Sequence, residues 1–220
     1  MLRAFTCAVL LAAGITMAHA QTEARATPIP APETDTPLAK GPHQTAVFGG
    51  GCYWGTQAVF ERLKGVETTQ AGFSVSPDDV TSALKDKPNY AESVRVVYNP
   101  AKISYGQLLR IFFSVAHDPT QLNRQDSDVG PQYRSVIFYQ NDEQQRLARA
   151  YITQLDTAHV FPAPIVTQVV PLKKFTAAED AQQDFALKNP DNPYIQQCDR
   201  PKLAALKQQF PELFQKYMGR

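Results

Sequence analysis

Residues 46–55 read Ala46-Val47-Phe48-Gly49-Gly50-Gly51-Cys52-Tyr53-Trp54-Gly55 and carry the clearest structural signal in the chain. Its first three residues form an apolar run of the kind found in buried strands. From residue 52 to residue 64 the apolar side chains recur at helical spacing, and Gly65 can cap the end of that helix. The three glycines between the two elements permit a tight turn and a close approach of the backbone to a ligand. The stretch therefore predicts a strand, a glycine turn and a helix that begins at Cys52.

The rest of the chain alternates between strand patterns and helix patterns. Residues 93–98 alternate in polarity as a half-buried strand does. Residues 104–115 place their leucines and phenylalanines on one helical face, with Ser104 as the N-cap. The remaining expected elements are strands at 133–139 and 165–171 and helices at 142–155, 176–187 and 202–217, the last interrupted near Pro211. This order predicts an α+β fold, a two-layer α/β sandwich of ferredoxin-like (split βαβ) type.

Length and composition describe one globular domain. The chain has 220 residues, of which 43% are hydrophobic, and this is enough for a sizeable core. The formal net charge is +1, with lysines and arginines scattered along the sequence, which argues against a nucleic-acid partner. No second long apolar run follows the N-terminus, so we expect no membrane span in the mature protein. A monomer is the default expectation.

The first twenty residues have the pattern of a secretory signal peptide. Arg3 supplies the positive charge, residues 8–17 the apolar stretch and Ala18-His19-Ala20 the cleavage site. We therefore expect a periplasmic or secreted protein, the alternative being a retained anchor or a buried helix. Residues 21–44 contain five prolines and no hydrophobic period, which predicts a disordered tether. The folded domain is expected over residues 45–220.

Two cysteines remain in the expected mature chain, Cys52 and Cys198, because Cys7 leaves with the signal. In an oxidising compartment they can form a structural disulfide, or they can act as a nucleophile and its resolving partner. Cys52 stands at a helix N-terminus, where free N–H groups and the helix dipole favour an anion, so we expect the pKa of its thiol to be lowered. Tyr53 and Trp54 can wall an apolar pocket beside the sulfur. The alternative is a buried structural cysteine.

The stretch around Cys52 resembles the Gly-Cys-Phe-Trp signature of the S-type peptide methionine sulfoxide reductases. Other blocks that resemble the family follow in order: Tyr90-Ala91-Glu92-Ser93-Val94, His117-Asp118-Pro119-Thr120, Asn123-Arg124-Gln125, Gln132-Tyr133-Arg134-Ser135 and Asn192-Pro193-Tyr194-Ile195. The resemblance extends from residue 46 to residue 214, nearly the whole expected domain. It implies the family's two-layer α/β sandwich, and thus a methionine sulfoxide reductase-like domain over residues 45–220.

The resemblance also implies a reaction. In the family a cysteine thiolate attacks the sulfur of methionine-S-sulfoxide, the oxygen leaves as water and the cysteine becomes a sulfenic acid. A second thiol then forms a disulfide, which a thioredoxin-like dithiol donor reduces without a cofactor or a metal. Carried onto this chain, the nucleophile is Cys52, the resolving thiol is Cys198 and the function is repair of oxidised exported proteins. The alternatives for Cys198 are a static disulfide with Cys52 and a thiol that never meets it.

The residues that activate the sulfoxide oxygen depart from the family pattern. Where the family has a glutamate five residues after the cysteine, this chain has Gln57, and the family's Gly-Tyr pair reads Gly72-Phe73. The histidine before Ala-Glu is Tyr90, and a late Tyr-His-Gln run reads Ala181-Gln182-Gln183. The resemblance places Tyr133 and Gln57 at the oxygen. The residues expected to line the substrate site are Tyr53, Trp54, Phe73, Glu92 and Asp128.

These departures leave the acid and the function open. Gln57 can donate a hydrogen bond but cannot release a proton at neutral pH, and loss of a positioned acid costs about 10²–10⁴ in rate. Glu92 or Asp128 can take over as the acid where burial raises its pKa, the alternative being carboxylates that only hold a loop. The open functions are action on another sulfoxide, thiol–disulfide chemistry, and binding of methionine sulfoxide without catalysis.

Overall fold

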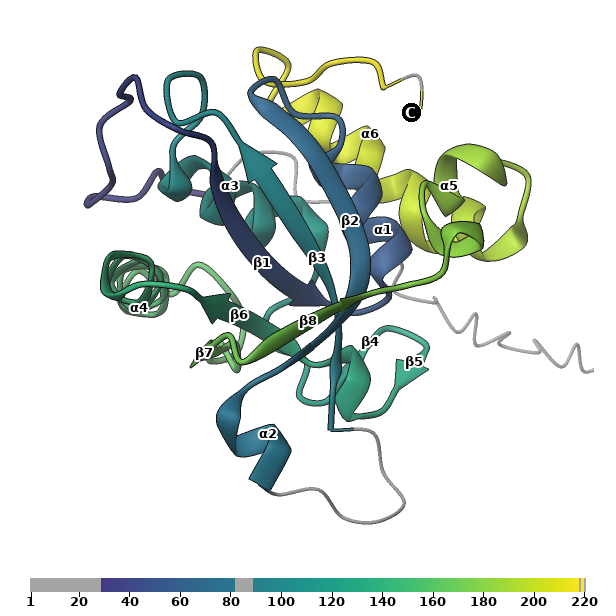
Figure 1. Ribbon diagram of the computed structural model, residues 1–220, viewed down its shortest axis with the longest axis horizontal. Coiled ribbons are helices and arrows are strands. Elements are labelled where there is room, and N and C mark those ends of the chain that lie inside the picture. Colours follow the sequence, from purple (N-terminus) through teal and green to yellow (C-terminus); the bar gives the residue numbers. More distant parts are fainter. Residues whose placement is uncertain (1–28, 82–88, 218, 220) are drawn as a thin grey trace, which may run out of the picture.

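One curled sheet forms the centre of the molecule. The computed structural model describes residues 29–81, 89–217 and 219, so the expected signal peptide lies outside the described residues. The sheet has six strands in the order β7-β6-β1-β3-β2-β8, and every neighbouring pair is antiparallel except β6 and β7 (Figure 1). The bounds of the strands are β1 Gln44–Gly50, β2 Val66–Val75, β3 Ala91–Tyr98, β6 Ser135–Tyr139, β7 Gln168–Pro171 and β8 Lys174–Ala177.

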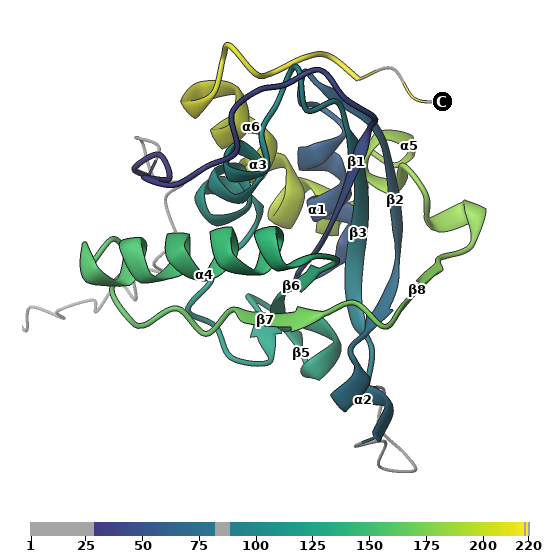
Figure 2. The ribbon, with the colours of Figure 1, turned by 60° about the vertical axis from the view of Figure 1, so that its left-hand side comes forward.

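The main helices lie on one side of this sheet, as Figure 2 shows. They are α1 Tyr53–Phe60, α3 Tyr105–Ile111, α4 Asp142–Thr157 and α6 Arg200–Gln209. The core fills the space between the two layers. Phe48 of β1 stacks there on Phe60 and on Phe112, with ring centroids 5.0 Å apart in each pair. The predicted mixture of strands and helices in two layers is confirmed.

Short elements complete the chain. The small elements are α2 Pro77–Thr81, α5 Phe185–Lys188, a two-stranded sheet of β4 Arg124–Gln125 and β5 Asp128–Val129, 3-10 helices at Pro131–Tyr133 and Asp180–Gln182, and π-helices at Phe112–Ala116 and Ile195–Asp199. The chain after β8 is therefore mostly short turns of helix, in contrast to the first half of the domain.

Residues 29–43 form an ordered strap, which differs from the disordered tether expected over residues 21–44. Ile29 is buried in the core, and its carbonyl accepts a hydrogen bond from Arg110 Nε at 2.8 Å. The carboxylate of Asp35 accepts hydrogen bonds from Gly106 N at 2.8 Å and from the hydroxyl of Ser104, so it adds a second cap to the start of α3. Prolines suit an extended strap because they keep φ near −65° and need no N–H partner. Residues 21–28 lie outside the described residues.

Two strands differ from the sequence-based expectation. The single helix expected over residues 176–187 is wrong: its first two residues belong to strand β8, which pairs with β2, and the rest contains only the short helices Asp180–Gln182 and Phe185–Lys188. The aromatic ring of Phe175 lies on the sheet, with the guanidinium of Arg95 over it at 4.9 Å. Strand β2 itself was not expected, since its polar and glycine residues hide the alternation. Both strands depend on partners far along the chain.

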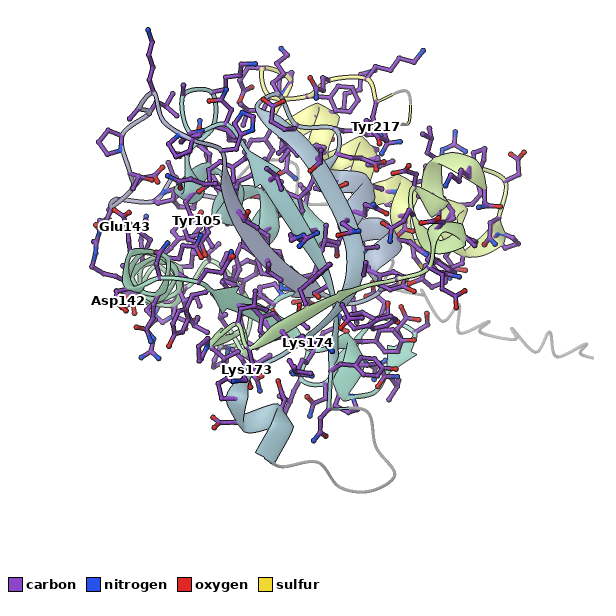
Figure 3. All side chains as sticks on the ribbon, viewed as in Figure 1. Tyr105, Asp142, Glu143, Lys173, Lys174 and Tyr217 are labelled. Atoms are coloured by element: carbon purple, nitrogen blue, oxygen red, sulfur yellow. The ribbon has the colours of Figure 1, made fainter. Side chains whose placement is uncertain are left out.

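Charged side chains at the ends of the elements lie at the surface (Figure 3). Asp142 and Glu143 are exposed in the first turn of α4, where carboxylates favour the positive end of the helix dipole. Lys173 and Lys174, at the junction of β7 and β8, are also exposed. These four side chains are in contact with solvent and lie outside the catalytic site described below.

Candidate active site

Strand β1 and helix α1 place the thiol of Cys52 at the end of the central strand. The turn between them needs glycine, since Gly51 has a φ of +87° and a Cβ on it would lie 2.6 Å from Gln125 Cβ. A Cβ on Gly49 would lie 2.8 Å from the carbonyl oxygen of Glu92, so the backbone of β1 passes very close to β3 here. Cys52 is the N-cap residue of α1 and only 8% exposed. The predicted strand, glycine turn and helix are confirmed.

The carboxylate of Glu92 contacts both the thiol of Cys52 and the start of α1. The backbone N–H of Tyr53, one of the free donors of the first helical turn, donates to Glu92 Oε2 at 3.1 Å. The thiol of Cys52 also hydrogen-bonds to this side chain. Burial raises the pKa of Glu92 to about 7 and outweighs these two hydrogen bonds, which lower it. At neutral pH Glu92 therefore exists in both its acid and its base form.

The thiol of Cys52 has a pKa well above its ordinary value, so the expected lowering is wrong for the free protein. Burial is the largest cause, and the charge of Glu92 adds to it. The N–H of Trp54 and the hydroxyl of Tyr194 hydrogen-bond to the sulfur and act in the opposite direction. The helix N-terminus thus lowers the pKa of Cys52 by less than burial raises it. In the resting site Cys52 is therefore mainly a neutral thiol at neutral pH.

Tyr194 joins the site from the C-terminal part of the chain. Its hydroxyl donates to the carboxylate of Asp128, and burial is the main cause of the raised pKa of this phenol. Its ring meets the indole of Trp54 edge-on, with centroids 5.7 Å apart. No separate sequence signal indicated a role for Tyr194, although this residue lies in one of the blocks that resemble the family. Its position beside Cys52 and Asp128 makes it a site residue.

Aromatic rings form the walls around the thiol. The ring of Phe73 lies edge-on to Tyr53 at 5.6 Å and to Tyr90 at 4.8 Å. The indole of Trp54 stacks on Phe185 at 3.8 Å, and its Nε1 donates to Gln182 Oε1 at 3.0 Å. These contacts give the sulfur an apolar surrounding on the side of β2 and α5.

Tyr133 lies at the edge of the site, on a turn that Arg134 holds in place. The guanidinium of Arg134 is buried, pairs with Asp79 at 3.0 Å and donates to the carbonyl oxygens of Tyr90 and Pro131. These bonds fix the turn that carries Tyr133. Burial and then the charge of Glu92 raise the pKa of Tyr133, so its phenol keeps its proton and can act as a donor near Glu92.

Gln57 makes its hydrogen bonds with Gln183 and Asp184, and these contacts do not support the expected contact with the reacting oxygen. Its side chain is 1% exposed, its Nε2 donates to Gln183 Oε1 at 3.2 Å and its Oε1 accepts from Asp184 N at 3.0 Å. Gln183 in turn donates to the carbonyl oxygens of Ala71 and Ala178. Gln57 therefore anchors the loop that holds Gln182 against Trp54, and its amide is taken up by these contacts instead of a substrate.

Cys198 lies on the π-helix Ile195–Asp199, four positions after Tyr194. It is half-buried, and both it and Cys52 are free thiols in the structure. Burial and then the charge of Asp199 raise the pKa of the Cys198 thiol, and Lys202 lowers it. The charge of Asp199 also raises the pKa of Cys52, so the same carboxylate acts on both thiols. π-Helical turns are frequent at functional sites.

The described part of the chain contains no group of three or more His, Cys, Asp or Glu side chains that could hold a metal ion. Within the same residues no helix has the length and apolar character needed to cross a membrane.

Known proteins resemble the chain over most of the domain. The sequence model of the family described as peptide methionine sulfoxide reductase matches residues 44–213. Peptide methionine sulfoxide reductase MsrA 2 of Mesorhizobium japonicum is 49% identical over 174 residues, which cover 78% of this chain and 89% of that protein. The protein of the same name from Synechocystis sp. is 45% identical over 172 residues, or 77% of this chain and 80% of that protein.

Two solved structures share the fold. Methionine sulfoxide reductase A of Corynebacterium diphtheriae superimposes with a TM-score of 0.55 and 31% sequence identity, covering 75% of this chain and 84% of that one. Mxr1 from Saccharomyces cerevisiae in reduced form gives a TM-score of 0.57 and 26% identity, covering 73% and 92%.

Proposed function

Because this chain belongs to the peptide methionine sulfoxide reductase family, and so to the oxidoreductases of the peptide-methionine (S)-S-oxide reductase class, we propose that it reduces methionine-S-sulfoxide with Cys52 as nucleophile and Glu92 as acid. The observation that carries these roles is the carboxyl of Glu92, which contacts the thiol of Cys52 and the N–H of Tyr53 together. An acid and a nucleophile in direct contact are what the reaction requires.

The first half-reaction moves an oxygen atom from the substrate to Cys52. The sulfur of Cys52 attacks the sulfoxide sulfur, and its proton passes through Glu92 to the sulfoxide oxygen. The protonated oxygen then bonds to the sulfur of Cys52, as its bond to the methionine sulfur and the new S–S bond both break. Overall, one thiol and one sulfoxide give one sulfenic acid and methionine, and the thiol hydrogen ends on the sulfenic acid oxygen. The pKa of about 7 at Glu92 suits both proton transfers near neutral pH.

The remaining site residues bind and orient the substrate. The hydroxyl of Tyr133 lies near Glu92 and Cys52, where it can donate to the polarised oxygen, whereas that of Tyr194 already donates to Asp128. The rings of Tyr53, Trp54 and Phe73 form an apolar slot that suits the methyl group and the side chain of methionine. In this proposal Asp128 orients Tyr194 instead of touching the substrate.

Cys198 completes the cycle as the resolving thiol. The sulfenic acid of Cys52 and the thiol of Cys198 form a disulfide and release water, and an external dithiol of the thioredoxin kind then reduces this disulfide. The position of Cys198 on the element that also carries Tyr194 into the site supports the assignment. The cycle needs no cofactor, since two thiols supply the two electrons.

The setting of the reaction is also a proposal. The pattern of residues 1–20 supports cleavage after Ala20 and export to the periplasm or beyond, where the substrate would be oxidised exported proteins. We take the protein as a monomer in that compartment. The strand order β6-β1-β3-β2 within the sheet, with antiparallel neighbours, supports the finer assignment to the ferredoxin-like (split βαβ) type.

The proposal is tested by turnover of both epimers of a methionine-sulfoxide peptide with dithiothreitol as reductant. The S epimer should be reduced and the R epimer should not, and Cys52→Ser should abolish the activity. Cys198→Ser should keep dithiothreitol-supported turnover but lose turnover with a thioredoxin-like donor. No reduction of the S epimer by protein with a titratable Cys52 would contradict the proposal, and the search would move to other sulfoxides or to binding without catalysis.

A further inference from the structure

Asp199 is a buried carboxylate beside the first turn of α1. It is 0% exposed and follows Cys198 directly on the π-helix Ile195–Asp199. A Cβ on Gly55 would lie 2.1 Å from Asp199 Oδ1, so the carboxylate rests on the bare backbone of α1 three residues after Cys52. The side chain therefore reaches from the element of one cysteine to the element of the other.

Neither oxygen of Asp199 accepts a hydrogen bond from any residue that the structure describes. Its nearest cation is Lys202 Nζ, at 3.6 Å from Oδ1, which is an ion-pair distance but too long for a hydrogen bond. Buried carboxylates are normally satisfied by donors, and an exception calls for an explanation. An anion with open acceptor positions, on the same helical turn as one cysteine and against the helix of the other, is suited to receive a proton.

We propose that Asp199 is the base that accepts the proton of Cys198 in the resolving step. The inference rests on the proposed function, because it assumes that Cys198 attacks the sulfenic acid of Cys52. In that step the sulfur of Cys198 bonds to the sulfur of Cys52 and the S–O bond of the sulfenic acid breaks. The proton of Cys198 goes to Asp199, and Glu92 protonates the departing hydroxide to water. The sulfur of Cys198 is oxidised and that of Cys52 is reduced.

Lys202 interacts with both groups of this proton transfer, since its charge lowers the pKa of Asp199 and that of Cys198. Before the transfer its ammonium faces the anion of Asp199, and the charge of Asp199 opposes ionisation of Cys198. After the transfer Asp199 is neutral, and the ammonium of Lys202 is left to stabilise the new thiolate. Burial raises the pKa of Asp199 to about 6, so the group is ionised at neutral pH and is a stronger base than an exposed aspartate. The titratable groups that face it are Lys202, Cys198, Cys52, Tyr194 and Asp128.

A single-turnover experiment separates the two steps. Reduced protein is mixed with excess methionine-S-sulfoxide peptide and quenched at intervals, and released methionine and the Cys52–Cys198 disulfide are both measured. In Asp199→Asn the disulfide should form about 10²-fold more slowly than in the wild type at pH 7, relative to methionine release. The matched control is Asp191→Asn, an exposed residue just before the π-helix, which should leave the ratio of the two phases unchanged.

The pH profile distinguishes a base from a structural support. Between about pH 6.5 and pH 8.5 the disulfide phase of Asp199→Asn should gain about tenfold per unit, because its thiolate then comes from solvent, while the wild type stays nearly flat. Lys202→Gln is the second variant and should also slow the disulfide phase, which keeps the test open where Asp199→Asn folds poorly.

Three outcomes contradict the proposal at different levels. Equal slowing of Asp199→Asn at all pH values, or slowing of less than about threefold, overturns the role of Asp199 as a base. A wild type that releases methionine without forming the disulfide refutes Cys198 as resolving thiol. A wild type that releases no methionine refutes the proposed function itself, and the role of Asp199 falls with it.

Discussion

Replacing Gln57 with glutamate should destabilise the domain and leave methionine sulfoxide turnover no higher. The side chain is buried, and its Nε2 donates to Gln183 Oε1. Gln183 cannot present its own amide N–H₂ instead, because that group already donates to Ala71 and Ala178. An ionised carboxylate in place of the Gln57 amide would therefore face an acceptor inside the core, so the variant folds with this acid protonated.

The free energy needed to keep the buried glutamate protonated depends on the pH. A glutamate has an ordinary pKa of about 4.3, so keeping it neutral costs about 4 kcal/mol at pH 7 and about 1 kcal/mol at pH 5. Folding raises the pKa of this glutamate above its value in the unfolded chain. Below the pKa that the glutamate has in the unfolded chain, the variant keeps its full free energy of unfolding. Above that pKa, this free energy falls as the pH rises.

Urea unfolding of both proteins under reducing conditions at pH 5 and pH 7 measures this difference. The control is Gln208→Glu on the exposed face of α6, which should change the free energy of unfolding by less than about 0.5 kcal/mol at either pH. A Gln57→Glu variant that is equally stable at both pH values, or that turns over the S epimer faster, would contradict the buried position of this side chain against Gln183.

Three other variants test the site and the strap. Glu92→Gln should lower turnover about 10²–10⁴-fold at pH 7 and remove the decline that the wild type shows as the pH rises through about 7, which a pH profile of kcat checks. Tyr194→Phe removes a hydroxyl that stabilises the thiolate of Cys52, so alkylation of Cys52 by iodoacetamide at pH 8 should slow by about tenfold. Asp35→Ala removes the bond to Gly106 N and should cost about 1 kcal/mol in urea unfolding.

A different result for any of the three variants would contradict the corresponding role. A Glu92→Gln protein with wild-type turnover would assign the acid to another group. Unchanged alkylation of Tyr194→Phe, measured in a Cys198→Ser background so that only one thiol reacts, would remove its hydroxyl from the thiolate. An Asp35→Ala protein as stable as the wild type would show that the strap does not hold α3.

The parts of the fold that the sequence predicted are those with local signals. Strand β1, the glycine turn and α1 follow from apolar runs and glycines that lie close together in the sequence, and α3 follows from the cap at Ser104 and its apolar face. Strands β2 and β8 and the strap around Ile29 were missed or misassigned, because what stabilises them is pairing or burial against distant segments. Propensity alone does not contain this information.

The site residues also divide into those with a local sequence signal and those that depend on contacts between distant segments. Cys52 and its aromatic neighbours were predictable from one short motif, and Glu92 was named as an alternative acid. The choice of Glu92 over Gln57 as the acid depends on tertiary contacts: the carboxylate of Glu92 binds the N–H of Tyr53, and the amide of Gln57 binds Gln183. Asp199 carries no sequence signal, since an Asp before Arg-Pro looks like an ordinary start of a helix. Only its burial against Gly55 reveals it.

The strap has a consequence for the order in which the domain assembles. The carbonyl of Pro30 accepts from the hydroxyl of Tyr151, and the N–H of Glu33 donates to Gln154, partners 121 positions later in the sequence. A chain that emerges from its N-terminus therefore presents Ile29 and the strap to solvent until α4 has been made and has packed on the sheet. Contacts so far apart form late and slowly, so the segment that emerges first is among the last to reach its native place.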